Sequence, residues 1–115
     1  MALFGSDKEL VDEAEIVAGK LKGVKTHQLR RIYSQVQSIY RQSEQNFNSA
    51  KSRLILLKPQ LAYAESRNDK LKPLSTKLIG LIDKVGDSPE NLEKFYQYVQ
   101  SVVAYHKEEK EVGER

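Results

Sequence analysis

The sequence of 115 residues predicts an all-α fold, a compact bundle of about five helices without a sheet. Apolar residues recur at steps of three and four in several stretches, which is the period of a helix face. Gln, Lys, Glu, Leu and Ala are plentiful, whereas the chain has six Gly and three Pro, a composition that favours helix. No stretch alternates apolar and polar residues as a half-buried strand does. We therefore expect one helical domain over residues 1–115, with 1–6 and 108–115 frayed.

The first two helices are marked by residues that cap helices. Ser6 followed by Glu9 is a capping-box pattern, and apolar residues then recur as far as Val24. Gly23 is a suitable end for this helix. Thr26 can cap a second helix, whose apolar stripe begins at Leu29.

The middle of the chain predicts two short helices separated by a proline. Weak helix formers over residues 46–49 indicate a break, and a third helix follows with Leu54 and Leu57 on its apolar face. Proline deep inside a helix removes a backbone hydrogen bond, so Pro59 suits the first turn of a short fourth helix that ends near Ser66.

The last two helices carry the clearest signals. Asn68 and Asp69 form a turn, and the next helix spans about 71–85 before Gly86. Ser88 followed by Pro89 begins the last helix. We expect four of the apolar residues of these helices to be buried in the core: Leu78, Leu81, Phe95 and Val99.

The charge of +3 is unevenly distributed along the chain. Between Lys20 and Lys72, twelve Lys and Arg stand against three acids, whereas residues 1–19 and 73–115 are each net acidic. A basic face on a folded domain raises the local concentration of phosphate groups. This asymmetry points to a polyanion as partner.

Several classes of protein are not favoured. The chain has no cysteine, which excludes disulfides, zinc fingers and thiol catalysis and fits a reducing cytoplasm. The longest apolar run is Leu54–Leu57, far short of the roughly 20 residues of a membrane span. The first residues resemble no secretion signal. We expect a cytoplasmic protein that does not contact a membrane.

Catalysis is not favoured either. The two histidines, His27 and His106, have no acidic neighbour at metal-ligand spacing. Asp83 and Asp87 are four residues apart and could bind a cation, but surface acids usually face water. No glycine-rich phosphate loop or nucleophile motif is present. We expect no enzyme, no metal and no cofactor, with an enzyme using Asp83, Asp87 and His106 as the remote alternative.

The basic residues form rows on their helices. Arg30 and Arg41 are eleven residues apart, almost three full turns, so they point the same way, and Arg31 lies beside them. Lys51 and Lys58 are seven apart and share a face if the chain stays helical between them. Such rows suit a phosphate backbone and do not read bases. The alternative is a solvated face that only keeps the protein soluble.

Tyrosines near these rows have two possible roles. Tyr33 and Tyr40 are seven residues apart and could stack bases, although closing the rim of the core is the better interpretation. Tyr63 and Arg67 are four apart on one face. We expect Tyr63 to pack against the bundle and leave Arg67 free for a partner.

Three sequence motifs, in this order and at these separations, resemble the Csm small-subunit family of type III-A CRISPR effector complexes. They are Thr26-x-x-Leu29-Arg30-Arg31-Ile32, then Leu57-Lys58-Pro59-Gln60-Leu61-Ala62-Tyr63-Ala64-x-x-Arg67, and finally Phe95-x-x-Tyr98 followed by Val102-Val103-Ala104-Tyr105-His106-Lys107. The resemblance runs from Thr26 to Lys107. The chain departs from the family at Gln100-Ser101, where Glu-Ala is usual, and at Glu65-Ser66, where Ala-Gly is common.

The resemblance implies a bundle of about five helices without enzymatic activity. Copies in this family line up head to tail beside the backbone subunits that hold the CRISPR RNA. Their basic face lies along the duplex of guide and target RNA. The implied partners are CRISPR RNA, target RNA, other copies of the chain, and the backbone and large subunits.

The candidate RNA-binding residues come from both arguments. Lys58 and Arg67 fall on the second family motif, and Arg30 and Arg31 on the first. Three residues are added from the charge pattern: Arg41, Lys51 and Arg53. The rival interpretation is a helical interaction module whose basic face binds an acidic protein.

Overall fold

The computed structural model describes residues 2–107, and within this range it contains five α-helices, one short 3₁₀ turn and no strand. The all-α bundle predicted from the sequence is confirmed. The helices are α1 (Asp7–Gly19), α2 (Thr26–Ser43), α3 (Phe47–Arg67), α4 (Lys72–Val85) and α5 (Pro89–Tyr105), and the 3₁₀ turn is η1 (Asp69–Leu71).

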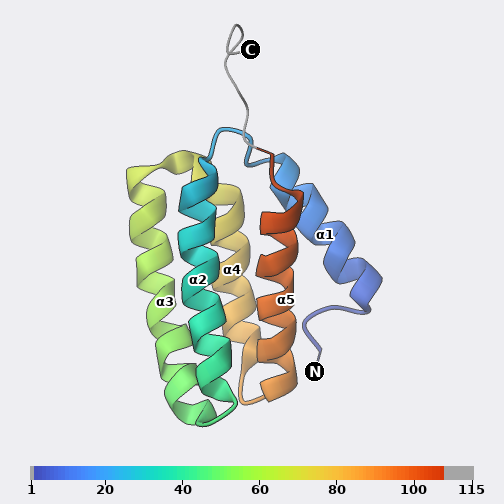
Figure 1. The fold of residues 1–115 in the computed structure, drawn as a ribbon, viewed down its shortest axis with the longest axis vertical. Helices are drawn as coiled ribbons and strands as arrows, with labels where there is room; N and C mark the ends of the chain where they lie inside the picture. Colours follow the sequence, from blue (N-terminus) through green and yellow to red (C-terminus); the bar gives the residue numbers. More distant parts are fainter. Residues whose placement is uncertain (1, 108–115) are drawn as a thin grey trace, which may run out of the picture.

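Helices α2 to α5 form an up-down-up-down bundle, and α1 packs obliquely on its outside (Figure 1). Short connections make each bundle helix antiparallel to the next, so that α3 lies between α2 and α4. Helix α1 contacts mainly α5, on the side of the molecule away from α3 (Figure 1). The molecule therefore has an α1 side and an α2–α3 side.

The core is apolar, as the helix-period pattern predicts. Leu78, Leu81, Phe95 and Val99 are all buried, which confirms the four core positions expected from the sequence. Helix α5 contributes the two largest fully buried side chains, Tyr98 and Phe95, because it contacts α1, α2 and α4. Burial of a phenylalanine such as Phe95 contributes about 1.5–3 kcal/mol.

One residue before α1, Phe4, belongs to the core. Phe4 is 9% exposed, and its ring stacks on Tyr98 of α5 with 5.3 Å between the ring centroids. The frayed start that we expected over residues 1–6 is thus not what the structure shows at Phe4, because an aromatic contact fixes the segment. The predicted fraying of 108–115 lies outside the described residues.

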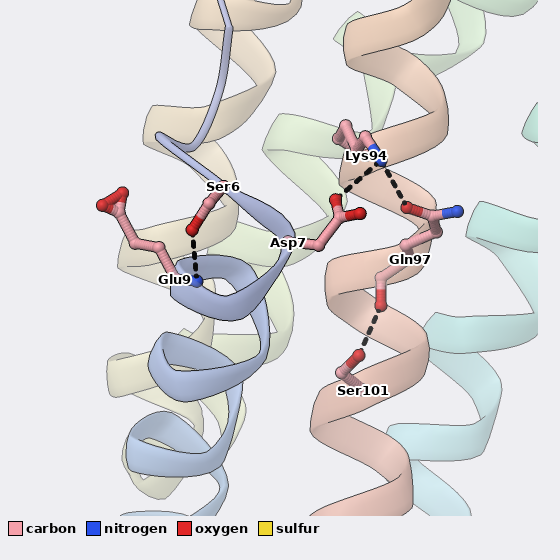
Figure 2. Close-up of polar contacts among 6 residues, drawn as sticks. All are labelled: Ser6, Asp7, Glu9, Lys94, Gln97 and Ser101. Carbon is pink, nitrogen blue, oxygen red and sulfur yellow. Dashed lines mark hydrogen bonds and ion pairs between the residues drawn. The ribbon is translucent and has the colours of Figure 1, made fainter.

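Caps and ion pairs fix α1 on the bundle (Figure 2). The Oγ of Ser6 accepts a hydrogen bond from the backbone N–H of Glu9 at 3.1 Å, which confirms the predicted cap. Asp7 pairs with Lys94 of α5 at 2.9 Å (Figure 2). On the next turn but one, Glu13 pairs with Lys77 of α4 at 2.6 Å.

Two helix ends differ slightly from the expectation. Helix α1 ends at Gly19 rather than at Gly23, and Lys25 rather than Thr26 occupies the cap position of α2. The expected end of α4 is confirmed, because Gly86 adopts a φ of +60°, where a side chain would be strained.

The prediction of a helix boundary at Pro59 is wrong, because α3 runs unbroken from Phe47 to Arg67. Leu54 and Leu57 before the proline and Leu61 after it are all buried, so packing against α2 and α4 holds both halves on one axis. Pro59 itself is exposed. The carbonyl of Ile55, which loses its usual partner, is four residues back on the same outer part of the helix, where water can donate to it.

Candidate nucleic-acid interface

The outer face of α2 carries arginines that form no polar contact with the other described residues. Arg30, Arg31 and Arg41 are exposed, and none of them forms an ion pair or hydrogen bond with residues 2–107. Arg30 and Arg41 stand about 16 Å apart along the helix axis. Helix α2 itself contains no acid that could offset this charge.

A ladder of glutamines joins α2 to α3 beside this face. Gln28, Gln35 and Gln42 follow each other at seven-residue intervals, which places them on one side of α2. Gln35 donates to Gln60 of α3 at 2.9 Å, and Gln28 accepts from Asn68 at 3.3 Å. We call these three α2 residues the glutamine ladder. Sequence reasoning missed it, although the regular spacing of neutral polar residues was a usable signal.

Arg53 of α3 bonds to the lower part of this ladder. Its guanidinium donates to the Oε1 of Gln42 at 2.7 Å and to the Oγ of Ser38 at 3.1 Å. Neither partner is charged, so Arg53 keeps its full positive charge while its position is fixed. The structure therefore brings Arg53 to the same side of the bundle as Arg31.

Lys51 and Lys58 face the other way, toward α4. Lys58 pairs with Asp83 at 2.5 Å, and Lys51 pairs with Asp87. Because α3 and α4 run antiparallel, Lys58 meets Asp83 on α4, and Lys51, seven residues earlier, reaches Asp87 in the turn that follows α4. Exposed pairs of this kind contribute about 0–1 kcal/mol and offset the lysine charge. These two candidates thus form a neutralised seam separate from the arginines of α2.

Arg67 and Tyr63 form a platform at the end of α3. Tyr63 is 63% exposed, so the expectation that it packs against the bundle is wrong. Arg67 donates to the Tyr63 hydroxyl at 3.2 Å, and its guanidinium carbon lies 5.9 Å from the ring centroid. The two side chains stack on each other because the four-residue spacing brings them to one face.

A mostly apolar groove lies between α2 and α3, next to this platform. Its volume is about 460 Å³. The buried floor includes Ile32, Leu57 and Leu61, and Arg31 and Tyr63 stand at the rim. We call this the α2–α3 groove. Sequence reasoning missed it because a groove depends on how two helices are spaced, which no local pattern encodes.

The tyrosines of α2, Tyr33 and Tyr40, pack against α5. Tyr40 stacks on Tyr96 with ring centroids 4.6 Å apart, and the hydroxyls of Tyr33 and Tyr96 lie 3.2 Å apart. This hydrogen bond raises the pKa of Tyr33 and lowers the pKa of Tyr96. Gln37 donates to both hydroxyls. The half-buried rings close the rim of the core, which was the preferred of the two sequence interpretations.

The outer face of α1 is acidic, in contrast with α2. Asp12 and Glu15 are exposed there, and they flank Ile16, which is 60% exposed. Lys8 pairs with Asp12 at 2.7 Å. Helix α1, which carries this acidic face, packs mainly on α5 and lies on the side of the bundle away from α3 (Figure 1).

The three residues considered for an enzyme, Asp83, Asp87 and His106, do not form one site. Asp83 and Asp87 pair with lysines of α3, whereas His106 contacts the carbonyl of Leu21 at 2.8 Å. Asp87 and His106 flank opposite ends of α5, a helix about 25 Å long. No cluster of three or more potential metal ligands occurs among residues 2–107.

None of the described helices is both long enough and apolar enough to span a membrane.

Comparison with known proteins identifies relatives over nearly the whole chain. The family model described as Csm2 Type III-A matches residues 6–112, so the match includes α1, which the sequence resemblance did not cover. Proteins named CRISPR system Cms protein Csm2 from Mycobacterium tuberculosis strains CDC 1551 / Oshkosh and ATCC 25618 / H37Rv are each 27% identical over 111 residues. These alignments cover 86% of this chain and 90% of each relative. No solved structure matches the chain.

Proposed function

Since the chain belongs to the Csm2 family of type III-A CRISPR effector subunits, we propose that it is a non-catalytic structural subunit that binds RNA. Copies of it form a filament inside the effector complex, in the cytoplasm. The basic face of this filament lies along the duplex of guide and target RNA, beside the backbone and large subunits.

The observation that carries the RNA proposal is the outer face of α2. Its three exposed arginines have no acidic partner within residues 2–107, and the helix has no acid of its own. Unpaired arginines attract phosphate at long range and bind it bidentately at short range. A straight row about 16 Å long fits a backbone that carries charge at regular intervals.

This face recognises backbone rather than sequence. Arginines fixed on a rigid helix can follow phosphates, and the minor groove of A-form RNA is wide and shallow enough to accept such a surface. Lys58 and Lys51 add charge only where the RNA displaces Asp83 and Asp87. Arg53 and Arg67 extend the arginine surface of α2 onto α3.

The distribution of charge supports a filament. The exposed acids around Ile16 on α1 are complementary in charge to the basic surface that α2 and α3 expose. A contact between two different faces of identical chains is heterologous, and it propagates as a row when the rotation does not close a ring. An acidic and partly apolar face on α1 can therefore meet the basic side of the next copy.

The RNA proposal is tested by reversing charge on α2. Arg30→Glu with Arg41→Glu should weaken RNA binding by about tenfold or more, since two phosphate contacts become repulsions. The matched control is Lys22→Glu with Lys84→Glu, which makes the same change in net charge at exposed lysines elsewhere. Fluorescence anisotropy with labelled RNA measures the affinity of each full-length variant.

The two variants separate the proposal from its rivals. Equal weakening by both would mean that net charge matters and the α2 face does not. Unchanged RNA affinity in the α2 variant, with loss of another protein subunit from the assembled complex, would favour an acidic protein partner for this face.

The filament proposal has its own test. Glu15→Lys with Ile16→Ser should lower the number of copies in each assembled complex, because the acidic face no longer matches a basic neighbour. Glu90→Lys, on exposed surface at the start of α5, is the control. Native mass spectrometry counts the copies, and an unchanged number in the double variant would place the contact elsewhere.

A further inference from the structure

We propose that the α2–α3 groove binds a single unpaired nucleobase of the RNA, stacked on Tyr63, with the adjoining phosphate on Arg31. This inference rests on the proposed RNA-binding function and adds a specific subsite to it. Tyr63 from α3 and Arg31 from α2 meet at the rim of the groove, on the α2–α3 side.

The groove has the size and the floor of a small-ligand site. Its volume of about 460 Å³ falls within the range of about 300–1,000 Å³ that is usual for such sites. Ile32, Leu57 and Leu61 form an apolar floor, and Pro59 contributes a side chain without a backbone donor. A flat, weakly hydrated ring is the kind of group that such a floor accepts.

Tyr63 provides an aromatic surface that the fold does not use. At 63% exposure its ring contributes little to the core, yet Arg67 holds it in place through a hydrogen bond of 3.2 Å and a stacking contact. A base that stacks on an exposed and positioned tyrosine gains affinity whatever its identity, because every base has a π-face.

Amide groups line the edges of the groove. Gln35 and Gln60 bond to each other across it at 2.9 Å, and Gln28 stands at its upper end. Each amide offers both a donor and an acceptor, as the edge of a base does. A base that enters the groove can therefore exchange the bond between Gln35 and Gln60 for bonds to its own edge.

The charge around the groove selects RNA over an apolar peptide. Arg31 lines the groove, no acidic side chain does so, and Arg67 lies behind Tyr63. Arg30 and Arg41 lie about a quarter turn round α2 from this rim, so a strand that crosses the outer face of α2 from them reaches Arg31 and the mouth of the groove. A base paired inside a duplex cannot enter a groove between two helices, so the occupant is unpaired.

The experiment compares two RNA duplexes that differ in one base. Both carry one unpaired nucleotide. In the first this nucleotide is 2-aminopurine, and in the second it is an abasic residue with the same phosphates. The full-length protein should bind the first about tenfold more tightly, the usual effect of one stacked base, and should quench its fluorescence.

Variants assign this preference to the groove. Tyr63→Leu should abolish both the preference and the quenching, whereas Tyr63→Phe should keep them, because the ring remains. Tyr105→Leu is the matched control, since Tyr105 is an exposed tyrosine at the end of α5 outside the groove. All three changes are on the surface, and circular dichroism should show unchanged helix content.

The preference and the absolute affinity answer different questions. Arg30→Glu with Arg41→Glu should weaken binding of both duplexes and preserve their ratio, which tests the proposed function alone. Equal affinity of the wild-type protein for the two duplexes would overturn the base site and leave the backbone interface intact. Loss of a protein subunit from the complex in Tyr63→Leu, with the base preference retained, would also overturn it in favour of a peptide groove.

Discussion

The α1 side and the α2–α3 side of the bundle use charge in opposite ways. On α1, Asp7 and Glu13 are consumed by ion pairs to Lys94 and Lys77, which fasten the helix to α5 and α4. On α2 the arginines point into solvent without a partner among the described residues. The two sides also differ in their apolar residues, because those of α1 are mainly buried, whereas α3 leaves Leu56 and Tyr63 exposed.

This difference separates residues that serve the fold from residues that are available to partners. An ion pair within the chain satisfies both charges and leaves little attraction for a third group. An exposed leucine is costly to hydrate, and an unpaired arginine has donors that no group of the fold occupies, so each retains binding energy for another molecule. The contrast predicts that equivalent substitutions on the two sides have unlike effects.

The largest difference in the free energy of unfolding should come from a Leu→Ala substitution made on α1 and, separately, on α3. Leu10→Ala on α1 removes a side chain that is 3% exposed and should lower the free energy of unfolding by about 2–5 kcal/mol. Leu56→Ala on α3 removes one that is 60% exposed and should change it by less than about 0.5 kcal/mol. Urea denaturation measures both. Similar losses would show that the face around Leu56 also supports the fold.

Charge reversal should separate RNA binding from folding. Lys58→Glu with Arg67→Glu should leave the helical circular dichroism spectrum nearly unchanged and weaken RNA binding by about tenfold. Lys77→Glu with Lys94→Glu has the same net charge but breaks the ion pairs of α1, so it should lower the melting temperature and spare RNA affinity. Early melting of the first variant, with RNA affinity intact, would assign Lys58 and Arg67 to folding.

A smaller effect is expected at the contact between Phe4 and Tyr98. The Tyr98 hydroxyl is buried without a hydrogen-bond partner among the described residues, and burial raises the pKa of this group above its usual value. Tyr98→Phe should therefore be neutral or stabilise the protein by about 1 kcal/mol. A clear loss of stability would mean that the hydroxyl has a partner, such as a bound water.

Tyr98→Phe should also change how the stability of the protein depends on pH. Because the pKa of Tyr98 is raised in the folded state, its contribution to stability is fully present below the usual tyrosine pKa of about 10 and is lost as the pH rises further. Tyr98→Phe should flatten the loss of stability above about pH 10 relative to wild type. Parallel curves for the two proteins in this range would contradict the burial of the phenol.

The smallest effect is expected at the seam between α3 and α4. Asp83→Asn removes the acid that pairs with Lys58, at a cost of about 0–1 kcal/mol in stability. The released lysine should raise RNA affinity about twofold to fivefold if the RNA reaches this seam. Affinity that does not rise in Asp83→Asn would remove Lys58 from the interface.

Local sequence patterns predicted the helices and the core well, because both depend on short-range periodicity. They failed at Pro59, where Leu57 and Leu61 on either side pack into one core and outweigh one lost backbone hydrogen bond. They also failed at Phe4, whose aromatic partner on α5 is far away in the sequence.

The candidate interface could be predicted only in part. The row from Arg30 to Arg41 follows from helix geometry alone. The pairs of Lys51 and Lys58 with Asp87 and Asp83 depend on which helices are neighbours and in what register, which the local pattern does not state. The α2–α3 groove depends on the same information, and so it appears only in the folded structure.

The salt dependence of RNA binding tests most directly the claim that the arginines of α2 are the RNA contact. Each phosphate contact releases counterions and so steepens the fall of RNA affinity with salt. Replacing Arg30 and Arg41 by glutamine should therefore reduce the magnitude of the slope of log K against log salt by about 2. The measurement compares wild type with Arg30→Gln plus Arg41→Gln between about 50 and 200 mM salt. A slope that falls by this amount is the predicted result. A slope equal to that of wild type would show that the RNA does not lie on this face.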